Sequence, residues 1–421
     1  MPRIVLATYG SLGDLHPALA LALGLQARGH RVEVATSEMY REKIGALGLP
    51  FHPLRPDLLA QGEHIIAEIM DGPRGSARLM RDHLFPAVRA MHEDLAPVTA
   101  GADLLIASEL VFPASILAAT HGVRWVSYVL APVSLFSLRD PSVLPVPAGL
   151  HWINRGGAPL QRLVKRAAKI VSHSWWRPLR QLRAEHGLPA GGHPLFEGKY
   201  SARLNLALFS AALQPPQPDW PTATVQTGFL FHDEARGHPA LPEAVVRFLA
   251  AGPPPVVFTL GSAAIYVAGN FYAESVRAAR SLGRRALLLL GKNPPPPDLP
   301  AAVLAWDYLL FAQIFPRAAA IVHQGGVGTT AQALRAGRPM LIVPFAHDQF
   351  DNAARIVRLG AGRMLARGRY RGPLVARELA ALWSDDKYAR ASEVAARQVR
   401  AESGLEKACD AIERILPATR R

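Results

Sequence analysis

Residues 321–330 read Ile-Val-His-Gln-Gly-Gly-Val-Gly-Thr-Thr and are the most informative part of the chain. An apolar run ends at His323, a glycine-rich turn follows, and a helical pattern begins near Val327. Glycines let backbone N–H groups approach an anion closely, and a helix N-terminus adds about half a positive charge. The stretch therefore predicts a strand, a turn and a helix that together suit a diphosphate.

Side chains in and beside this turn extend the prediction. His323 and Thr329 can donate hydrogen bonds to phosphate oxygens, and Ser262, at another strand end, can do so from the opposite side. Turns of this kind also occur for packing alone. A sharper alternative is a dinucleotide site, because residues 326–331 satisfy the pattern G-x-G-x-x-A and Asp348 lies about 20 residues further on.

Two polar residues follow the next apolar run, residues 340–344. Asp348 is a short hydrogen-bond acceptor, and the amide of Gln349 can both donate and accept. Adjacent sugar hydroxyls need this mixture, so the pair is a candidate sugar-binding site. Asp348 can also cap the helix that follows it, and the two roles can coexist.

Strands and helices alternate along the chain. In the first half we expect strands at 4–9, 31–36, 104–109 and 124–131, and helices at 17–28, 37–47 and 113–122. In the second half we expect strands at 256–260, 285–290, 319–323 and 340–344, and helices at 271–282, 329–336 and 349–359. The alternation predicts α/β architecture, with two doubly wound parallel sheets facing across a cleft.

The proline-rich segment 214–220 is interpreted as the approach to a linker between two domains. We therefore expect domains at residues 1–215 and 216–400. A C-terminal helix within 401–421 is expected to pack back on the first domain.

Composition narrows the class of protein. The chain has 421 residues, 50% of them hydrophobic, and a net charge of +14, which favours anionic partners such as nucleotide diphosphates. The single cysteine, Cys409, excludes a disulfide framework and fits the cytoplasm. We expect no leader before the first strand, no membrane-spanning helix and no nucleic-acid partner.

Three motifs in order resemble the bacterial nucleotide-sugar glycosyltransferases with two Rossmann-like domains, the GT-B fold of family 1 type. They are residues 10–17, 323–330 and 347–352. The resemblance is to macrolide, glycopeptide, sterol and flavonoid glycosyltransferases, and most of all to the rhamnolipid rhamnosyltransferase type. It implies that the first domain binds the acceptor and the second binds the donor; residues 55–215 match no motif.

The resemblance also implies roles for particular residues. His323 and the turn that follows it would hold the donor phosphates, Asp348 and Gln349 would contact the sugar, and Tyr308 or Trp306 would stack on the pyrimidine. Plant relatives hold the ribose with a glutamate where this chain has Ala331, which leaves room for dTDP beside UDP. The expected donor-binding set is Ser262, Trp306, Tyr308, His323, Gly325, Gly326, Val327, Gly328, Thr329, Asp348 and Gln349.

Transfer of glucose or rhamnose from such a donor needs a base for the acceptor hydroxyl. Asp14, after the first strand, is our candidate, and partial burial would raise its pKa. Asp14 could instead cap a helix that starts at Pro17, and His16 is the competing base. No Asp-x-Asp pair occurs in the chain, so we expect no metal and no cofactor beyond the nucleotide sugar, with inversion at the sugar carbon.

The acceptor site is expected to be apolar. The stretches 65–70, 79–91 and 129–136 are rich in Leu, Ile, Met and Phe, which favours a lipophilic acceptor such as a polyphenol, macrolide, sterol or hydroxy-lipid. Residues 155–183 carry eight Lys or Arg and no acid, and Trp152, Trp175 and Trp176 lie in or beside them. Segment 152–183 can therefore contact an anionic membrane. A solvated basic face is the alternative.

Other functions stay open from the sequence alone. An oxidoreductase that uses NAD or FAD would explain the G-x-G pattern. A sugar-nucleotide epimerase or a catalytically silent binding subunit would use the same two-domain scaffold.

Overall fold

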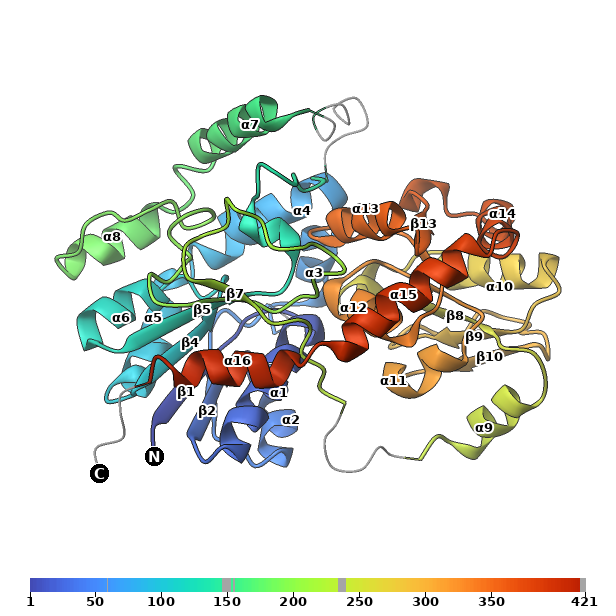
Figure 1. The fold of residues 1–421 in the computed structure, drawn as a ribbon, viewed down its shortest axis with the longest axis horizontal. Helices are drawn as coiled ribbons and strands as arrows, with labels where there is room; N and C mark the ends of the chain where they lie inside the picture. The colour runs from blue at the N-terminus through green and yellow to red at the C-terminus, as the bar shows by residue number, and fades with distance from the viewer. Residues whose placement is uncertain (59, 146–152, 154–155, 234–239, 417–421) are drawn as a thin grey trace.

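The computed structural model describes residues 1–58, 60–145, 153, 156–233 and 240–416. Two parallel β-sheets with helices on both faces form two halves that lie side by side (Figure 1). This arrangement confirms the α/β class and the two doubly wound sheets predicted from the sequence.

The first sheet has the strand order β3-β2-β1-β4-β5-β6-β7, and all its neighbouring strands are parallel. Its strands are β1 (Arg3–Ala7), β2 (Arg31–Thr36), β3 (Phe51–Pro53), β4 (Leu104–Ser108), β5 (Arg124–Val129), β6 (Asn205–Ala207) and β7 (Thr224–Gln226). The helices of this half are α1 (Leu12–Ala27), α2 (Arg41–Ala46), α3 (Glu63–Ile69), α4 (Gly72–Arg78), α5 (Val88–Thr99), α6 (Ala114–His121), α7 (Ala158–Val171) and α8 (Arg177–Glu185).

The second sheet has the order β10-β9-β8-β11-β12-β13 and is also parallel throughout. Its strands are β8 (Val256–Thr259), β9 (Ala286–Leu289), β10 (Val303–Trp306), β11 (Ala320–His323), β12 (Met340–Ile342) and β13 (Gly362–Met364). The helices that follow β7 are α9 (Glu243–Ala250), α10 (Phe271–Ser281), α11 (Phe311–Ile314), α12 (Val327–Ala336), α13 (Gln349–Leu359), α14 (Gly372–Trp383), α15 (Lys387–Ala401) and α16 (Gly404–Glu413).

The strand order places the ligand site. In each sheet the order in which strands are added reverses between two neighbouring parallel strands, β1 and β4 in the first sheet and β8 and β11 in the second. Open α/β sheets bind ligands outside the carboxyl ends of the strands at this switch point. The loops that begin at Thr8, Glu109, Leu260 and Gln324 follow these four strands.

The structure corrects two expectations. The first helix begins at Leu12 rather than Pro17, because Ser11 caps it by accepting a hydrogen bond from the Gly13 N–H. The first sheet also extends past residue 215, because β7 pairs with β6. Gln214 is buried and its side chain bonds to Asp140, so segment 214–220 belongs to the first half rather than to a linker.

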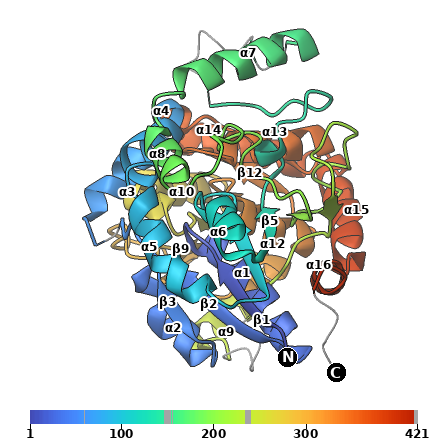
Figure 2. The same cartoon turned by 90° about the vertical axis from the view of Figure 1, so that its left-hand side faces the viewer.

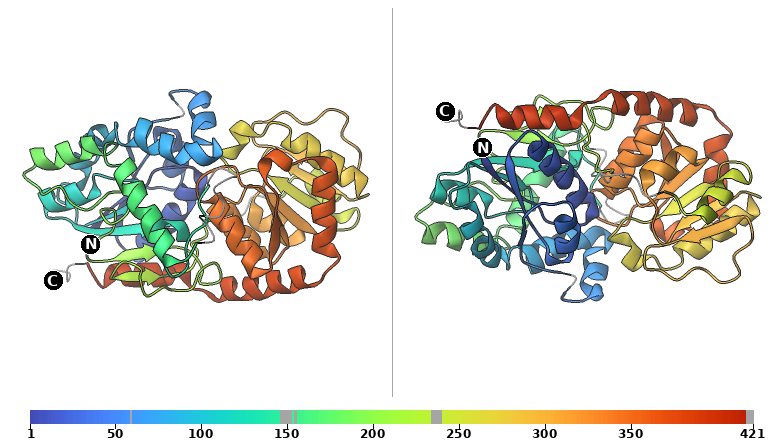
Figure 3. Two further views of the ribbon diagram at one scale, coloured as in Figure 1. Left: turned by 90° about the horizontal axis from the view of Figure 1, so that it is seen from above. Right: turned by 90° about the horizontal axis from the view of Figure 1, so that it is seen from below.

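The C-terminal helices run along one side of both halves, as Figure 3 shows from above and below. Helix α15 packs on α12 in the second half, and α16 packs on α1 in the first. Ile412 of α16 is buried in the same apolar cluster as Ile4 of β1 and Leu19 of α1. The end of the chain therefore contributes to the core of its beginning.

Candidate active site

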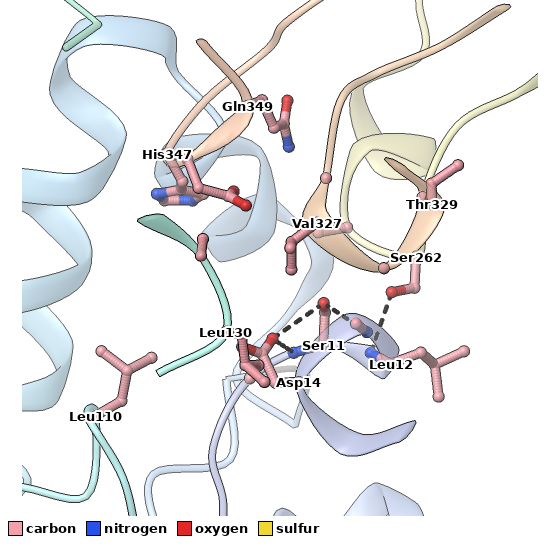
Figure 4. Close-up of a pocket in the computed structure, with 18 of the residues that line it drawn as sticks. Ser11, Leu12, Asp14, Leu110, Leu130, Ser262, Val327, Thr329, His347 and Gln349 are labelled. Carbon is pink, nitrogen blue, oxygen red and sulfur yellow. Dashed lines mark hydrogen bonds between the residues drawn. The ribbon is translucent and has the colours of Figure 1, made fainter. Parts of the chain in front are cut away.

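A cavity of about 980 Å³ lies between the two halves. The four loops that follow β1, β4, β8 and β11 contribute to its wall. Ser11, Leu12 and Asp14 lie on one side of it, and Ser262, Val327 and Thr329 lie on the other (Figure 4). The cavity is large enough for a donor and a sizeable acceptor together.

The two halves touch each other at the wall of this cavity. The Leu12 N–H donates to Ser262 Oγ at 3.2 Å (Figure 4). Ser262 was expected to hydrogen-bond a diphosphate. In the structure its Oγ accepts a hydrogen bond from the first half, and its hydroxyl hydrogen remains available to donate to a phosphate oxygen. A side-chain carbon added at Gly328 would lie 3.4 Å from the Cα of Gly13, so glycine allows the two loops to approach.

Asp14 is the third residue of α1 and is held from one side. Its Oδ2 accepts from the Ser11 N–H at 2.8 Å and from Ser11 Oγ at 3.2 Å. The pKa of Asp14 is raised to about 6, mainly by burial; the Glu109 carboxylate also raises it, and the bonds from Ser11 lower it. The expectation that Asp14 caps a helix starting at Pro17 is wrong, because the helix starts at Leu12. Asp14 instead completes the capping box that Ser11 begins.

His16 also lines the cavity, two residues along α1. Its pKa is lowered to about 3, mainly by burial and also by the nearby Lys43 and His232. The rings of His16 and His232 lie 5.5 Å apart. A group with so low a pKa is a weak base at neutral pH, so the pKa shifts of the two residues favour Asp14 over His16.

The turn after β11 matches the expected anion site in part. The cavity wall includes Gly326, Val327, Gly328 and Thr329, and the first N–H groups of α12 lack partners within the helix. Gly325 does not line the wall; its N–H donates to His323 Nδ1 at 3.1 Å, so it is unavailable to a phosphate. That amide is a correction to the expected donor-binding set.

His323 lies under the turn rather than on the cavity wall and is fully buried. Because Nδ1 accepts from Gly325, the neutral ring carries its hydrogen on Nε2, which has no partner among the described residues. Burial lowers the pKa of His323 to about 3. Its contact with a donor phosphate stays a prediction.

Asp348 and Gln349 both line the cavity. Burial raises the pKa of Asp348 to about 7; the bond from Asn352 Nδ2, at 2.7 Å, lowers it, and the Asp14 carboxylate raises it. The Asp348 side chain makes no helix cap, which excludes that alternative. Gln349 Oε1 accepts from the backbone N–H groups of Phe345 and Ala346, so only its amide nitrogen can serve a sugar.

The two aromatic candidates differ in position. Tyr308 lines the cavity and is 52% exposed, whereas Trp306, at the end of β10, packs on the apolar core and does not reach the wall. Tyr308 is therefore the better placed of the two to stack on a base. Among the described residues, no group of three or more His, Cys, Asp or Glu side chains is arranged to hold a metal ion.

Sequence reasoning missed His347, which directly precedes Asp348 and Gln349. It has φ +56°, in the left-handed region, and its Nδ1 lies 2.9 Å from Ser76 Oγ of α4 in the first half. Gly72 and Ala346 form a β-bridge beside it. The residue lay within a motif that the sequence had already marked, but nothing local indicated that α4 would contact it.

The acceptor side of the cavity draws on all three apolar stretches, through Ile66, Ile69 and Met70, Leu79 and Met80, and Leu130, Val133 and Phe136. Other members of the second stretch, such as Phe85 and Met91, are fully buried core. Sequence reasoning missed Glu109, Lys165, Phe196 and Lys199. Glu109 could have been found from its place directly after β4, whereas the other three lie where no motif was recognised.

The basic segment contains α7, which projects from the body of the molecule in two perpendicular views (Figures 1 and 2). Leu163, Ile170 and Val171 of α7 are 63–77% exposed. Trp176 is buried in the core and Trp175 is partly buried, whereas Trp152 and Arg155 lie outside the described residues. No helix in the described part of the chain is long and apolar enough to span a membrane.

Comparison with known proteins agrees with this geometry. A family model described as "Erythromycin biosynthesis protein CIII-like, C-terminal domain" matches residues 291–412, and one described as "Glycosyltransferase family 28 N-terminal domain" matches residues 4–93. O-mycaminosyltylonolide 6-deoxyallosyltransferase of Streptomyces fradiae is 32% identical over 98% of this chain and 97% of its own. Glycosyltransferase GtfE of Amycolatopsis orientalis is 32% identical over 86% of this chain and 85% of its own.

Solved structures agree on the fold. The crystal structure of glycosyltransferase VinC in complex with dTDP has a TM-score of 0.66 over 98% of both chains at 21% identity. At this identity the likeness bears on the fold alone.

Two facing doubly wound sheets with an anion-binding turn define the GT-B class, and the chain belongs to its family 1 type of glycosyltransferases, related to the natural-product enzymes. It transfers sugar from a nucleotide donor to a small acceptor. The oxidoreductase, epimerase and silent-subunit alternatives do not fit this family. The G-x-G turn follows β11, the fourth strand of its sheet, whereas a dinucleotide fingerprint follows the first.

Proposed function

We propose that the enzyme transfers the sugar in a single displacement with inversion and without a metal ion, with Asp14 as the base. The acceptor oxygen gives its proton to Asp14 and bonds to the anomeric carbon. The bond from that carbon to the diphosphate oxygen breaks, and the nucleotide diphosphate leaves with the electron pair.

One observation carries this proposal: Asp14 and the N-terminus of α12 share one cavity, across the contact between Gly13 and Gly328. The raised pKa of Asp14 suits a base that must accept a proton near neutral pH. The N–H groups of Val327, Gly328 and Thr329 and the helix dipole would stabilise the charge of the leaving diphosphate. The unpartnered Nε2–H of His323 would add a donor from below.

We propose dTDP as the preferred nucleotide and retain UDP as the alternative. Ala331 stands where a ribose-binding glutamate occurs in plant relatives, and VinC was crystallised with dTDP. For the sugar we retain glucose and 6-deoxyhexoses such as rhamnose; the Streptomyces fradiae relative is named for transfer of a 6-deoxyallosyl group. Asp348 and the amide nitrogen of Gln349, which both line the cavity, would bind its hydroxyls.

For the acceptor we propose a lipophilic natural product, and a macrolide before a flavonoid, sterol or hydroxy-lipid. The apolar side chains on the first-half wall support this class. The relative named for a tylonolide acceptor supports a macrolide.

The decisive experiment replaces Asp14 with Asn and measures transfer and donor binding separately. Loss of a general base lowers kcat by about 10²- to 10⁴-fold, while the thermal shift with dTDP or UDP should stay that of the wild type. Asp386→Asn, a change at an exposed carboxylate in the second half, is the matched control and should keep full activity. Full activity in Asp14→Asn would remove Asp14 from the mechanism.

We also propose that α7 contacts an anionic membrane surface while the cytoplasmic enzyme collects its acceptor. Its exposed Leu163, Ile170 and Val171 lie among Arg162, Arg166 and Lys169. Wild-type protein should pellet with vesicles that contain anionic lipid and not with neutral vesicles. Replacement of the three apolar residues by Ser should abolish pelleting. If wild-type protein pellets equally and negligibly with both kinds of vesicle, the proposed membrane contact is wrong.

A further inference from the structure

The acceptor side of the cavity ends in a pair of aromatic rings. Phe136 and Phe196 both line the wall, with ring centroids 4.8 Å apart. Phe136 follows the 3₁₀ helix Pro132–Leu135 and has φ +48°, a left-handed conformation that costs a non-glycine residue about 1 kcal/mol or more. The surrounding fold therefore holds this ring in place at a cost.

Only two of the described residues on the cavity wall are lysine or arginine: Lys165 of α7 and Lys199. Lys199 is paired with Glu109, whose other carboxylate oxygen accepts from Ser134. Lys199 is thus neutralised inside the protein, and its pair with Glu109 leaves no free charge for a ligand.

Lys165 is different. Its Nζ lies 5.5 Å from the ring centroid of Phe196 and 5.9 Å from that of Phe136, near the outer limit of a cation–π contact. Within the part of the chain that the structure describes, no carboxylate lies within 4 Å of it. The carboxylates of Glu197 and Asp219 interact with Lys165 only through longer-range electrostatic attraction. Glu197 pairs with Lys169, and Asp219 accepts hydrogen bonds from Ser137 Oγ and the Leu138 N–H.

We infer that Lys165 binds a carboxylate carried by the lipophilic acceptor, whose apolar body packs on Phe136 and Phe196. The inference rests on the proposed function, since it concerns the acceptor of that reaction. A partly buried ammonium group with three donors and no acidic partner is incomplete, and an acidic ligand supplies the missing acceptor. An apolar wall that ends in one unpaired cation would select acidic acceptors over neutral ones of the same shape.

The test uses two matched pairs of probes: 4′-hydroxybiphenyl-4-carboxylic acid with its methyl ester, and 10-hydroxydecanoic acid with its methyl ester. Calorimetry at pH 8 should show that wild type binds at least one acid about tenfold or more tighter than its ester, as a charge-assisted hydrogen bond predicts. Lys165→Met should lose this preference, and Lys165→Arg should keep most of it.

Arg166→Met is the control, because it removes an exposed positive charge from the next position of the same helix and should keep the preference. Thermal shift with dTDP should be the same in all four proteins, which separates this inference from the proposed function. If wild type prefers neither acid, including by binding none of the probes, or if Lys165→Met keeps the preference, the inference is wrong. If no nucleotide diphosphate binds to wild type, the proposed function fails instead.

Discussion

Asp14 is a half-buried carboxylate on a cavity wall, and its pKa is raised to about 6. If Asp14 is the base, kcat/KM should fall with a slope of one as pH drops through about 6, because the protonated carboxyl cannot accept the acceptor proton. His16, with a pKa of about 3, would place that limb near pH 3 instead. Rates measured between pH 4.5 and 9 distinguish the two, and a flat profile to pH 4.5 would favour His16.

The same carboxylate affects stability. The pKa of Asp14 in the folded state lies above its unfolded value of about 3.8. The stability that the protonated Asp14 carboxyl contributes is therefore fully present below pH 3.8 and is lost as pH rises through about 6. Asp14→Asn cannot ionise and should be more stable than wild type at pH 8, by at most about 3 kcal/mol, with no gain at pH 4. Thermal unfolding at the two pH values measures this, and a gain of equal size at both would show that charge burial is not its cause.

At the scale of elements, the strand ends were predictable and their mutual contacts were not. The predicted ends near Tyr9, Glu109, Leu260 and His323 fall within two residues of those in the structure, because apolar runs bounded by glycine or polar residues mark buried parallel strands. That pattern places Asp14 and residues 326–329 at one cavity.

The remaining site features depend on packing between distant segments. The Gly325 amide is taken by the His323 ring, the Gln349 oxygen by backbone N–H groups, and Ser76 contacts His347 across the two halves. No local sequence signal encodes these partners. Lys165 likewise lines the cavity only because of where α7 packs in the folded chain. The sequence alone therefore could not predict that Lys165 lies on the proposed acceptor side.

The turn between β11 and α12, where we propose that the donor diphosphate binds, depends on glycine at 325. This residue has φ +90°, and an added Cβ would lie 2.8 Å from Ile342 Cγ2. Gly325→Ala should therefore displace the turn and weaken dTDP binding by about tenfold or more, since it combines backbone strain with a steric clash.

Gly283→Ala is the matched control for that prediction, because Gly283 has φ +58° with nothing within 4 Å of an added Cβ. It should cost about 1 kcal/mol of stability and leave dTDP affinity unchanged. Equal affinities in the two variants, measured by calorimetry, would show that the turn does not bind the donor.

At the scale of the molecule, the two sheets share one strand order over six strands, the first having β7 in addition, and the end of the chain packs on both halves. After α15, the chain crosses to the first half at Glu402, whose carboxylate accepts from Ser210 Oγ at 2.8 Å. Helix α16 then covers α1, where Arg28 pairs with Asp410 and Glu413. Asp14 lies in the first turn of α1, so the C-terminal helix supports the element that positions the proposed base.

This arrangement predicts that a change near the C-terminus destabilises the N-terminal sheet. Ile412 of α16 is fully buried against residues of β1 and α1, so Ile412→Ala should lower the free energy of unfolding by about 2–5 kcal/mol. Val394 of α15 is 56% exposed, so Val394→Ala removes apolar atoms only from the solvent-facing surface. This control should change the free energy of unfolding by less than about 0.5 kcal/mol. Hydrogen exchange should show lost protection in β1 and α1 for Ile412→Ala, more than 380 residues away in sequence. If protection falls only within α16 itself, the helix is a peripheral attachment and the N-terminal core is complete without it.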